Sequence, residues 1–178
     1  MKIGIMQGRL LPPVNGHIQE FPDNWKEEFK ILESLGLHGV EWLVTKKSWL
    51  SNPIYQTPEM VQKYPIISVC LDTLVEQKIY QKDFLVEMVE SFCEKIKDTN
   101  ITNITIPLLE DSSLEDDNKR KLFCEAINQI GEKYKNINFC FEAELAPEKL
   151  MEIVSLRNNF YVTYDTGNTT SYGLDHLK

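Results

Sequence analysis

Short apolar runs alternate with amphipathic segments along the whole chain. Six of these runs have the length and composition of buried strands, and they predict strands over 2–7, 39–44, 66–71, 103–108, 138–142 and 161–165. Successive runs begin about 23 to 37 residues apart, which is enough for one strand and one crossover helix. The pattern therefore predicts an α/β fold built around a parallel sheet.

The segments between the runs have helical periodicity. The first helix is expected to open with a capping box formed by Asn24 and Glu27 and to end at Gly36. Its apolar face would consist of Trp25, Phe29, Leu32 and Leu35. Further helices are expected from Pro58 and over 82–97, 114–134 and 147–155. The strands are nearly all apolar, which is typical of a sheet covered on both faces.

Composition and charge narrow the classes of function. The 178 residues fit one domain, and the net charge of −8 disfavours a nucleic-acid backbone or an anionic membrane surface as a partner. No apolar run approaches the roughly 18 residues of a membrane span. The four cysteines are widely spaced without a C-x-x-C pair, so buried, reduced thiols and a cytoplasmic location are expected.

Two carboxylates end apolar runs and are the strongest candidates for chemistry. Glu142 follows Phe141, and Asp165 ends the last run. A carboxylate at the end of a buried strand is costly unless it is paired, hydrogen-bonded or metal-bound. Two on successive strands indicate the mouth of an α/β barrel, where catalytic groups project. The alternatives are a salt bridge for Glu142 and a helix or turn cap for Asp165.

Other polar residues follow the predicted strands. Arg9 could clamp a phosphate or carboxylate through its planar fork, or form a salt bridge within its loop. Glu144 points the same way as Glu142 if the strand continues that far, and otherwise lies in an exposed loop. Trp42 is either a core residue or a substrate platform. The candidates for substrate binding are Gln7, Arg9, Glu41, Trp42, Asp72, Glu144 and Asn168. Glycine-rich phosphate-binding motifs are absent from the sequence, so it gives no support for nucleotide binding.

The sequence resembles the sugar phosphate isomerase/epimerase family with a xylose-isomerase-like TIM barrel. The matching stretches are MKIGIMQGRL at 1–10, GLHGVEW at 36–42, SVCLD at 68–72, FEAEL at 141–145 and YDTGN at 164–168. They follow the family order over nearly the whole chain, and they look most like members associated with bacterial surface-sugar pathways. Asn168 stands where some relatives have a substrate-binding histidine.

The resemblance implies a divalent-metal site for Mn²⁺, Mg²⁺ or Zn²⁺. Glu142 would be both a metal ligand and a catalytic carboxylate, and Asp165 would be a second metal ligand. The family takes its remaining ligands, a histidine and a glutamate, from the seventh and eighth strands. Residues 1–178 are therefore expected to form a single, incomplete TIM barrel with about six of eight βα units. The substrate would be a small sugar or sugar phosphate.

Three functions remain open. The first is a metal-dependent isomerase or epimerase that moves a proton next to a carbonyl through an enediolate, here as an N-terminal portion without full activity. The second is a non-catalytic binding or assembly module that forms homo-oligomers through open barrel edges. The third is a relative of the endonuclease IV repair enzymes, which the acidic charge and the lack of histidines at strand ends disfavour.

Overall fold

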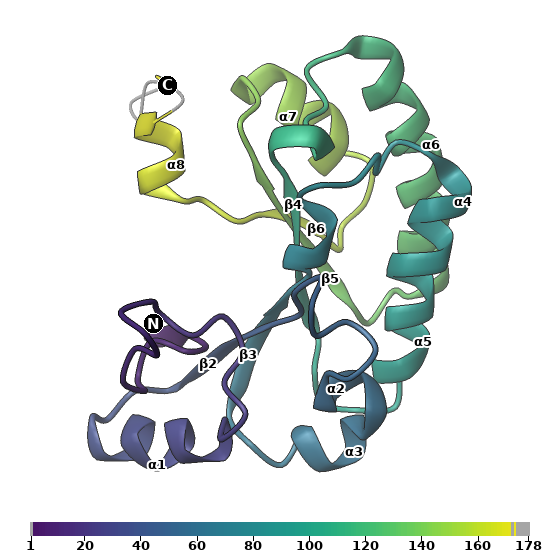
Figure 1. Ribbon diagram of the computed structural model, residues 1–178. Coiled ribbons are helices and arrows are strands. Elements are labelled where there is room, and N and C mark those ends of the chain that lie inside the picture. The colour runs from purple at the N-terminus through teal and green to yellow at the C-terminus, as the bar shows by residue number, and fades with distance from the viewer. Residues whose placement is uncertain (1, 172, 174–178) are drawn as a thin grey trace.

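The computed structural model describes residues 2–171 and 173, and its centre is a parallel six-stranded sheet (Figure 1). The strands follow one another in the sheet in chain order: β1 (Gly4–Met6), β2 (Gly39–Leu43), β3 (Ile66–Cys70), β4 (Asn103–Leu108), β5 (Asn138–Ala143) and β6 (Phe160–Val162). Every neighbouring pair is parallel. The predicted α/β class and parallel sheet are thus confirmed.

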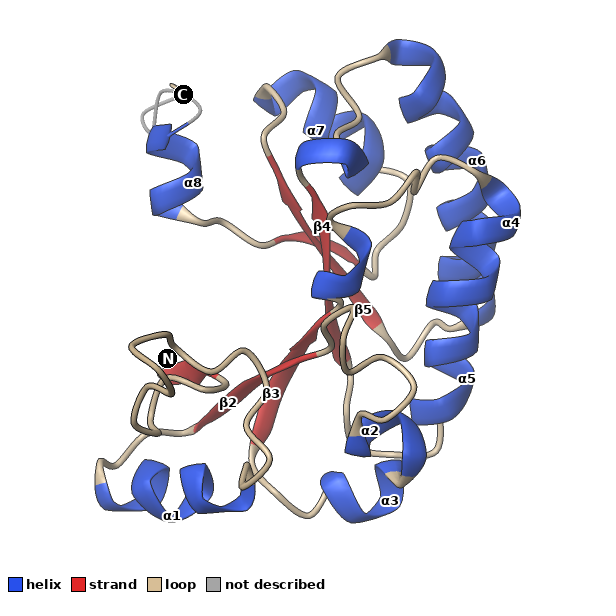
Figure 2. Ribbon diagram, viewed as in Figure 1, coloured by secondary structure: helices blue, strands red, loops and turns tan. Residues whose placement is uncertain are grey.

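Helices connect the strands, as the spacing of the apolar runs predicts (Figure 2). They are α1 (Lys26–Ser34), α2 (Pro53–Gln56), α3 (Pro58–Val61), α4 (Lys82–Leu85), α5 (Ser91–Ile96), α6 (Asp117–Lys133), α7 (Pro147–Val154) and α8 (Thr166–Ser171). A π-helical segment, Val86–Glu90, joins α4 to α5, so the helix expected over 82–97 is present with one wider turn. No helix in the described residues is both long and apolar enough to span a membrane.

The start of α1 differs from the prediction. The capping residue is Trp25 in a helical conformation, and no side chain caps the helix, so the capping box does not form. Leu35 lies outside the apolar face and is 60% exposed. The end of the helix is as predicted, because Gly36 adopts φ +67°, a left-handed conformation that favours glycine.

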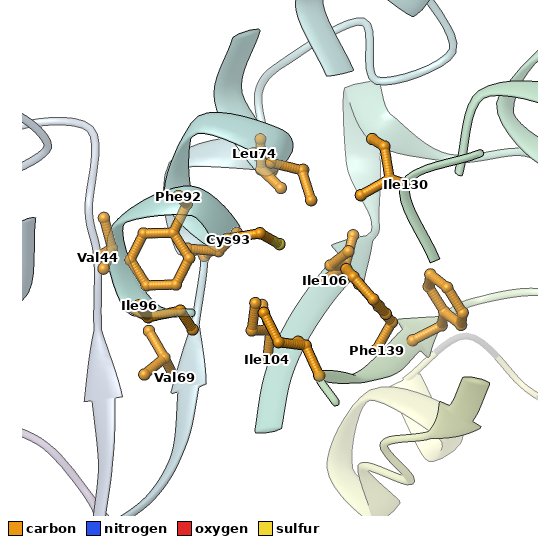
Figure 3. Packing of buried hydrophobic residues seen from close by; sticks show 14 of the residues in the cluster. Val44, Val69, Leu74, Phe92, Cys93, Ile96, Ile104, Ile106, Ile130 and Phe139 are labelled. Atoms are coloured by element: carbon orange, nitrogen blue, oxygen red, sulfur yellow. The ribbon is translucent and has the colours of Figure 1, made fainter. Parts of the chain in front are cut away.

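The two faces of the sheet have different chemistry. Alternate residues of the strands pack against the helices, and this helix face is apolar: Figure 3 shows Val69 of β3 and Ile104 of β4 close to Phe92 and Ile96 of α5. The residues between them point the other way. On this interior face the strands carry Glu41, Ser68, Cys70, Thr105, Cys140 and Glu142. The expectation of nearly all-apolar strands therefore holds for the helix face alone.

The loop after β2 is fixed from within the core. The indole N–H of Trp42 donates to Asn52 Oδ1 at 2.8 Å, and the Asn52 amide donates to the Leu43 carbonyl at 2.9 Å. Asn52 also caps α2 by accepting a hydrogen bond from the Ile54 N–H. Both Trp42 and Asn52 are fully buried. One asparagine therefore joins the end of β2 to the helix that follows it.

We expect Asn52→Ala to destabilise the fold by about 1–3 kcal/mol, because it leaves the buried Trp42 N–H and the Leu43 carbonyl without their partner. Urea unfolding would measure the loss. The matched control is Asn118→Ala at an exposed position of α6, which should change stability by less than about 0.5 kcal/mol. Equal unfolding midpoints for the two variants would contradict this role of Asn52.

Candidate functional site

Glu142 lies near the carboxyl end of β5 and points to the interior face. Its neighbour Phe141 is fully buried on the helix face, so alternation turns Glu142 the other way. The half-buried carboxylate accepts a 2.7 Å hydrogen bond from the Asn168 side-chain amide. Burial raises the pKa of Glu142; the Asn168 hydrogen bond opposes this shift, and the charges of Asp165, Glu41 and Asp72 add to it. None of the ion pairs in residues 2–171 and 173 includes Glu142.

Asp165 lies outside the sheet, contrary to the prediction that it ends a strand. Strand β6 stops at Val162, and Asp165 directly precedes α8. Its Oδ1 accepts a 2.9 Å hydrogen bond from the Asn168 backbone N–H, which is the capping geometry that the sequence left open as an alternative. Asn168 therefore contacts both carboxylates, one through its backbone and one through its side chain.

Glu41 is the second carboxylate of the interior face. It lies on β2 between Val40 and Trp42, both fully buried on the helix face. Glu41 Oε1 accepts hydrogen bonds from the Ser68 hydroxyl at 2.9 Å and the Thr105 hydroxyl at 3.0 Å. These hydroxyls belong to β3 and β4, so the carboxylate bridges three strands.

Two cysteines lie beside these carboxylates on the interior face. Burial, reinforced by the charge of Glu41, raises the pKa of Cys140 to about 11. Burial also raises the pKa of Cys70, and the charges of Glu41, Asp72 and Glu142 add to that shift. Both thiols are therefore protonated at neutral pH and are poor nucleophiles. All four cysteines are free, as the sequence predicts, but only Cys70 and Cys93 are buried, whereas Cys124 and Cys140 are half-buried.

Gln7 and Trp42 lie behind the site, within the core. Gln7 is fully buried, and its Oε1 accepts a 3.0 Å hydrogen bond from the Leu43 N–H. Trp42 packs edge-on against Phe21 and Trp25. Neither side chain presents a surface to a ligand, so both hold the ends of β1 and β2 in place. For Trp42 this is the core alternative considered above.

Glu28 was not identified from the sequence, although it fixes the loop after β1. It is 1% exposed, and its Oε1 accepts hydrogen bonds from the backbone N–H of Gly8 at 2.6 Å and of Leu10 at 3.4 Å. Burial raises its pKa. A clue was present, because Glu28 lies three residues after Trp25, on the apolar side of α1.

Gly8 closes this loop and so determines where Arg9 lies. Its φ is +81°, and a Cβ at this position would lie 1.6 Å from the Gln19 carbonyl oxygen, so a side chain does not fit. Arg9 follows it, exposed, with Nη2 3.4 Å from the Met6 sulfur. The guanidinium is thus held beside the end of β1.

Asp72 lines an acidic cavity of about 380 Å³ beyond the ends of β2 to β4. The lining residues are Glu20, Thr45, Lys46, Lys47, Asp72, Thr73, Val75, Glu76 and Glu110. Asp72 is exposed, yet the pKa of its carboxyl is raised. The largest cause is that the surrounding protein displaces part of its water, and the charges of Glu20, Glu110 and Glu76 add to the shift. Glu144 lies one residue past β5 and is half-buried.

The described residues do not form a complete metal site. Carboxylate oxygens suit Mg²⁺ or Mn²⁺, but one oxygen of Glu142 and one of Asp165 are hydrogen-bonded to Asn168. Within residues 2–171 and 173, no group of three or more His, Cys, Asp or Glu side chains is arranged to hold a metal ion.

Comparison with known proteins supports the fold. No protein-family model and no curated protein matches this chain. Among solved structures, it is similar to a xylose isomerase-like TIM barrel/4-hydroxyphenylpyruvate dioxygenase fusion protein, with a TM-score of 0.63 and 14% sequence identity. The similarity covers 98% of this chain but 28% of the fusion protein. The chain therefore has a fold of the xylose isomerase-like TIM-barrel class.

We expect the free energy of unfolding of Glu142→Gln, taken relative to wild type, to be higher at pH 7 than at pH 4. A carboxyl with a raised pKa contributes stability that is fully present below its ordinary pKa of 4.5 and is lost as pH rises through the folded-state value. Glutamine does not ionise, so the variant does not lose this stability, which amounts to about 1.4 kcal/mol for each unit by which the pKa is raised. Its side-chain oxygen can still accept the hydrogen bond from Asn168. Urea unfolding at both pH values, with the exposed Glu59→Gln as control, would measure it. A pH-independent difference between Glu142→Gln and wild type would contradict it.

Proposed function

We propose that this chain carries the proton-transfer site of a sugar isomerase or epimerase, with Glu142 as the acid–base residue. The observation that carries the proposal is a half-buried carboxylate with a raised pKa on the interior face, near the carboxyl end of a strand. In barrels of this class, that end of the strands is where catalytic residues lie. A pKa moved toward neutrality suits a group that both accepts and returns a proton.

The reaction follows from carboxylate chemistry. Glu142 removes a proton from the carbon next to a substrate carbonyl. The electron pair of that C–H bond forms the C=C bond of the enediolate, and the π pair of the carbonyl moves to its oxygen. Return of the proton to the former carbonyl carbon, with transfer of a proton from the neighbouring hydroxyl oxygen to the former carbonyl oxygen, gives the isomer. Protonation of the original carbon on its opposite face, by an acid on that side, gives the epimer. The Asn168 amide holds the Glu142 carboxylate in one orientation. Arg9 and Glu144 remain candidates for contacts with the sugar.

Exchange of carbon-bound hydrogen with solvent tests this proposal, because it requires proton removal but not complete turnover. In D₂O we expect the wild-type protein to introduce deuterium next to the carbonyl of D-fructose, D-psicose or D-fructose 6-phosphate, measured by NMR. Glu142→Gln should slow this exchange about 10²–10⁴-fold for at least one of these sugars.

The control for this experiment is Glu59→Gln, an exposed change on α3 that should leave exchange unaltered. Wild-type protein that exchanges none of the three sugars above the buffer rate would refute the proposal. Undiminished exchange by Glu142→Gln would remove this residue from the reaction.

A divalent cation is a separate part of the proposal. Glu142 and Asp165 are the described residues that would contact it, and a shell with so few protein ligands should bind weakly, at about millimolar concentration or above. Titration with Mn²⁺, followed by electron paramagnetic resonance, would measure this, and Asp165→Asn should weaken binding further. Micromolar binding would show that ligands beyond these two take part.

The edges of the sheet support the assembly module as a second candidate. Large apolar side chains are exposed on or next to the edge strands β1 and β6, namely Ile3, Met6, Tyr161 and Val162. Unpaired edges with apolar side chains favour association. Sedimentation of the protein at increasing concentration would distinguish a monomer from such an assembly.

A further inference from the structure

A large cavity lies between the loop that follows β1 and the loop that follows β2. This loop cavity has a volume of about 1100 Å³, just above the roughly 300–1,000 Å³ that is usual for small-molecule sites. The described residues that line it include neither Glu41 nor Glu142. Its walls combine aromatic, hydroxyl and charged side chains, among them Phe21, Trp25, Ser48, Ser51, Asp23 and Lys47.

The apolar wall of the loop cavity belongs to the aromatic core. The rings of Phe21 and Trp25 pack edge-on against Trp42, with centroids 5.4 and 5.0 Å away. Trp42 points to the helix face of β2, so these two rings lie on that side of the sheet and not on the interior face. Phe21 is only half-buried, and part of its ring is therefore accessible to a ligand from a rigid support.

The polar wall offers several groups for hydrogen bonds. Ser48 and Ser51 supply hydroxyls, and Asp23 supplies an exposed carboxylate. Asp23 belongs to none of the ion pairs in the described part of the chain. Lys47 and Glu20 are 3.9 Å apart and both exposed, and ion pairs of this kind are weak. These side chains can therefore turn to a ligand at little cost.

This combination suits an uncharged carbohydrate. A sugar ring has apolar C–H groups that pack on an aromatic ring, and its hydroxyls exchange hydrogen bonds with serine, lysine and carboxylate groups. With His17 uncharged, the carboxylates of Glu20 and Asp23 and the ammonium of Lys47 leave a net charge of −1 in the cavity. A phosphate or another anion is thus disfavoured.

We propose that the loop cavity is a binding site for an uncharged carbohydrate of at least two sugar rings. The length follows from the space available. The loop cavity adjoins the acidic cavity around Asp72, because Glu20, Thr45 and Lys47 line both. The inference goes beyond the function proposed above and does not rest on it, since binding here requires no reaction at Glu142.

Binding of maltose, cellobiose and D-glucose, measured by calorimetry and by saturation-transfer NMR, tests this proposal. We expect at least one of the two disaccharides to bind at about millimolar concentration and D-glucose to bind more weakly. Phe21→Leu keeps an apolar side chain but removes the flat ring, so it should weaken disaccharide binding about three- to tenfold. Asp23→Ala removes an exposed hydrogen-bonding carboxylate and should weaken binding about tenfold.

The matched control is Phe84→Leu, the same change at a half-buried position of α4 outside the loop cavity, which should bind as wild type does. Circular dichroism would confirm that each variant is folded. Wild-type protein that binds neither disaccharide, or undiminished binding by folded Phe21→Leu and Asp23→Ala, would overturn the site. Equal affinity for D-glucose would overturn its length, and tighter binding of D-gluconate would overturn its preference for an uncharged ligand.

The loop cavity and the proposed reaction can fail separately. Glu142→Gln should bind the disaccharides as wild type does, because Glu142 does not line the cavity. A loss of disaccharide binding in Glu142→Gln would place the sugar on the interior face and overturn the loop cavity as its site. Disaccharide binding without any deuterium exchange would instead refute the proposed function and support the loop cavity.

Discussion

The structure depends on the alternation of side chains across a parallel sheet. One face must be apolar enough to pack against helices, and the other is turned to the interior of the curved sheet. On β2, Val40 and Trp42 pack against the helices, and Glu41 between them points to the interior face. Phe141 and Glu142 repeat the arrangement on β5. The site thus consists of positions that the helix-packed core does not need, and the apolar helix face supplies the stability that the partly buried carboxylates cost.

Buried polar residues behind the site fix the loops around it. Glu28 holds the backbone of Gly8 and Leu10, and Asn52 holds the end of β2. Each is buried among apolar groups, where a hydrogen bond is strong and an unmade one is costly. The backbone on either side of Arg9 is consequently held by a buried carboxylate. Rigid supports of this kind are what a catalytic site requires, because small displacements of the reacting groups reduce the rate steeply.

The fold was largely readable from the sequence, whereas the site was readable only in part. The order of strands and helices follows from apolar periodicity, which packing enforces. Asp165 was placed in a strand because Tyr161 and Val162 continue the apolar pattern, yet both are exposed on an edge strand that ends early. Leu35 satisfies the helical spacing but lies at the end of α1, where it is exposed. Periodicity reports which residues share a face, but it cannot say where the covering layer ends.

The polar partners were harder to find for a different reason. Ser68 and Thr105 are short side chains within apolar strands, and small polar residues of this kind are tolerated in many cores. Their importance appears only when the register of β2, β3 and β4 brings their hydroxyls to the same oxygen of Glu41. Strand register between distant segments is a property of the assembled sheet, so a single sequence does not show it.

Two groups of carboxylates near the strand ends can be told apart by their partners. Around Asp72, Glu76 and Glu20 pair with Lys46 and Lys47 at exposed positions, where ion pairs are weak and water solvates each charge. On the interior face, Glu41 and Glu142 have hydroxyl and amide partners and no cation in the described chain. Burial raises the pKa of Glu142, and the negative charges of Asp165, Glu41 and Asp72 add to that shift because like charges disfavour the ionised form. The interior-face carboxylates therefore keep their charge partly out of water and without a cation among the described residues, whereas the acidic groups that pair with Lys46 and Lys47 are solvated.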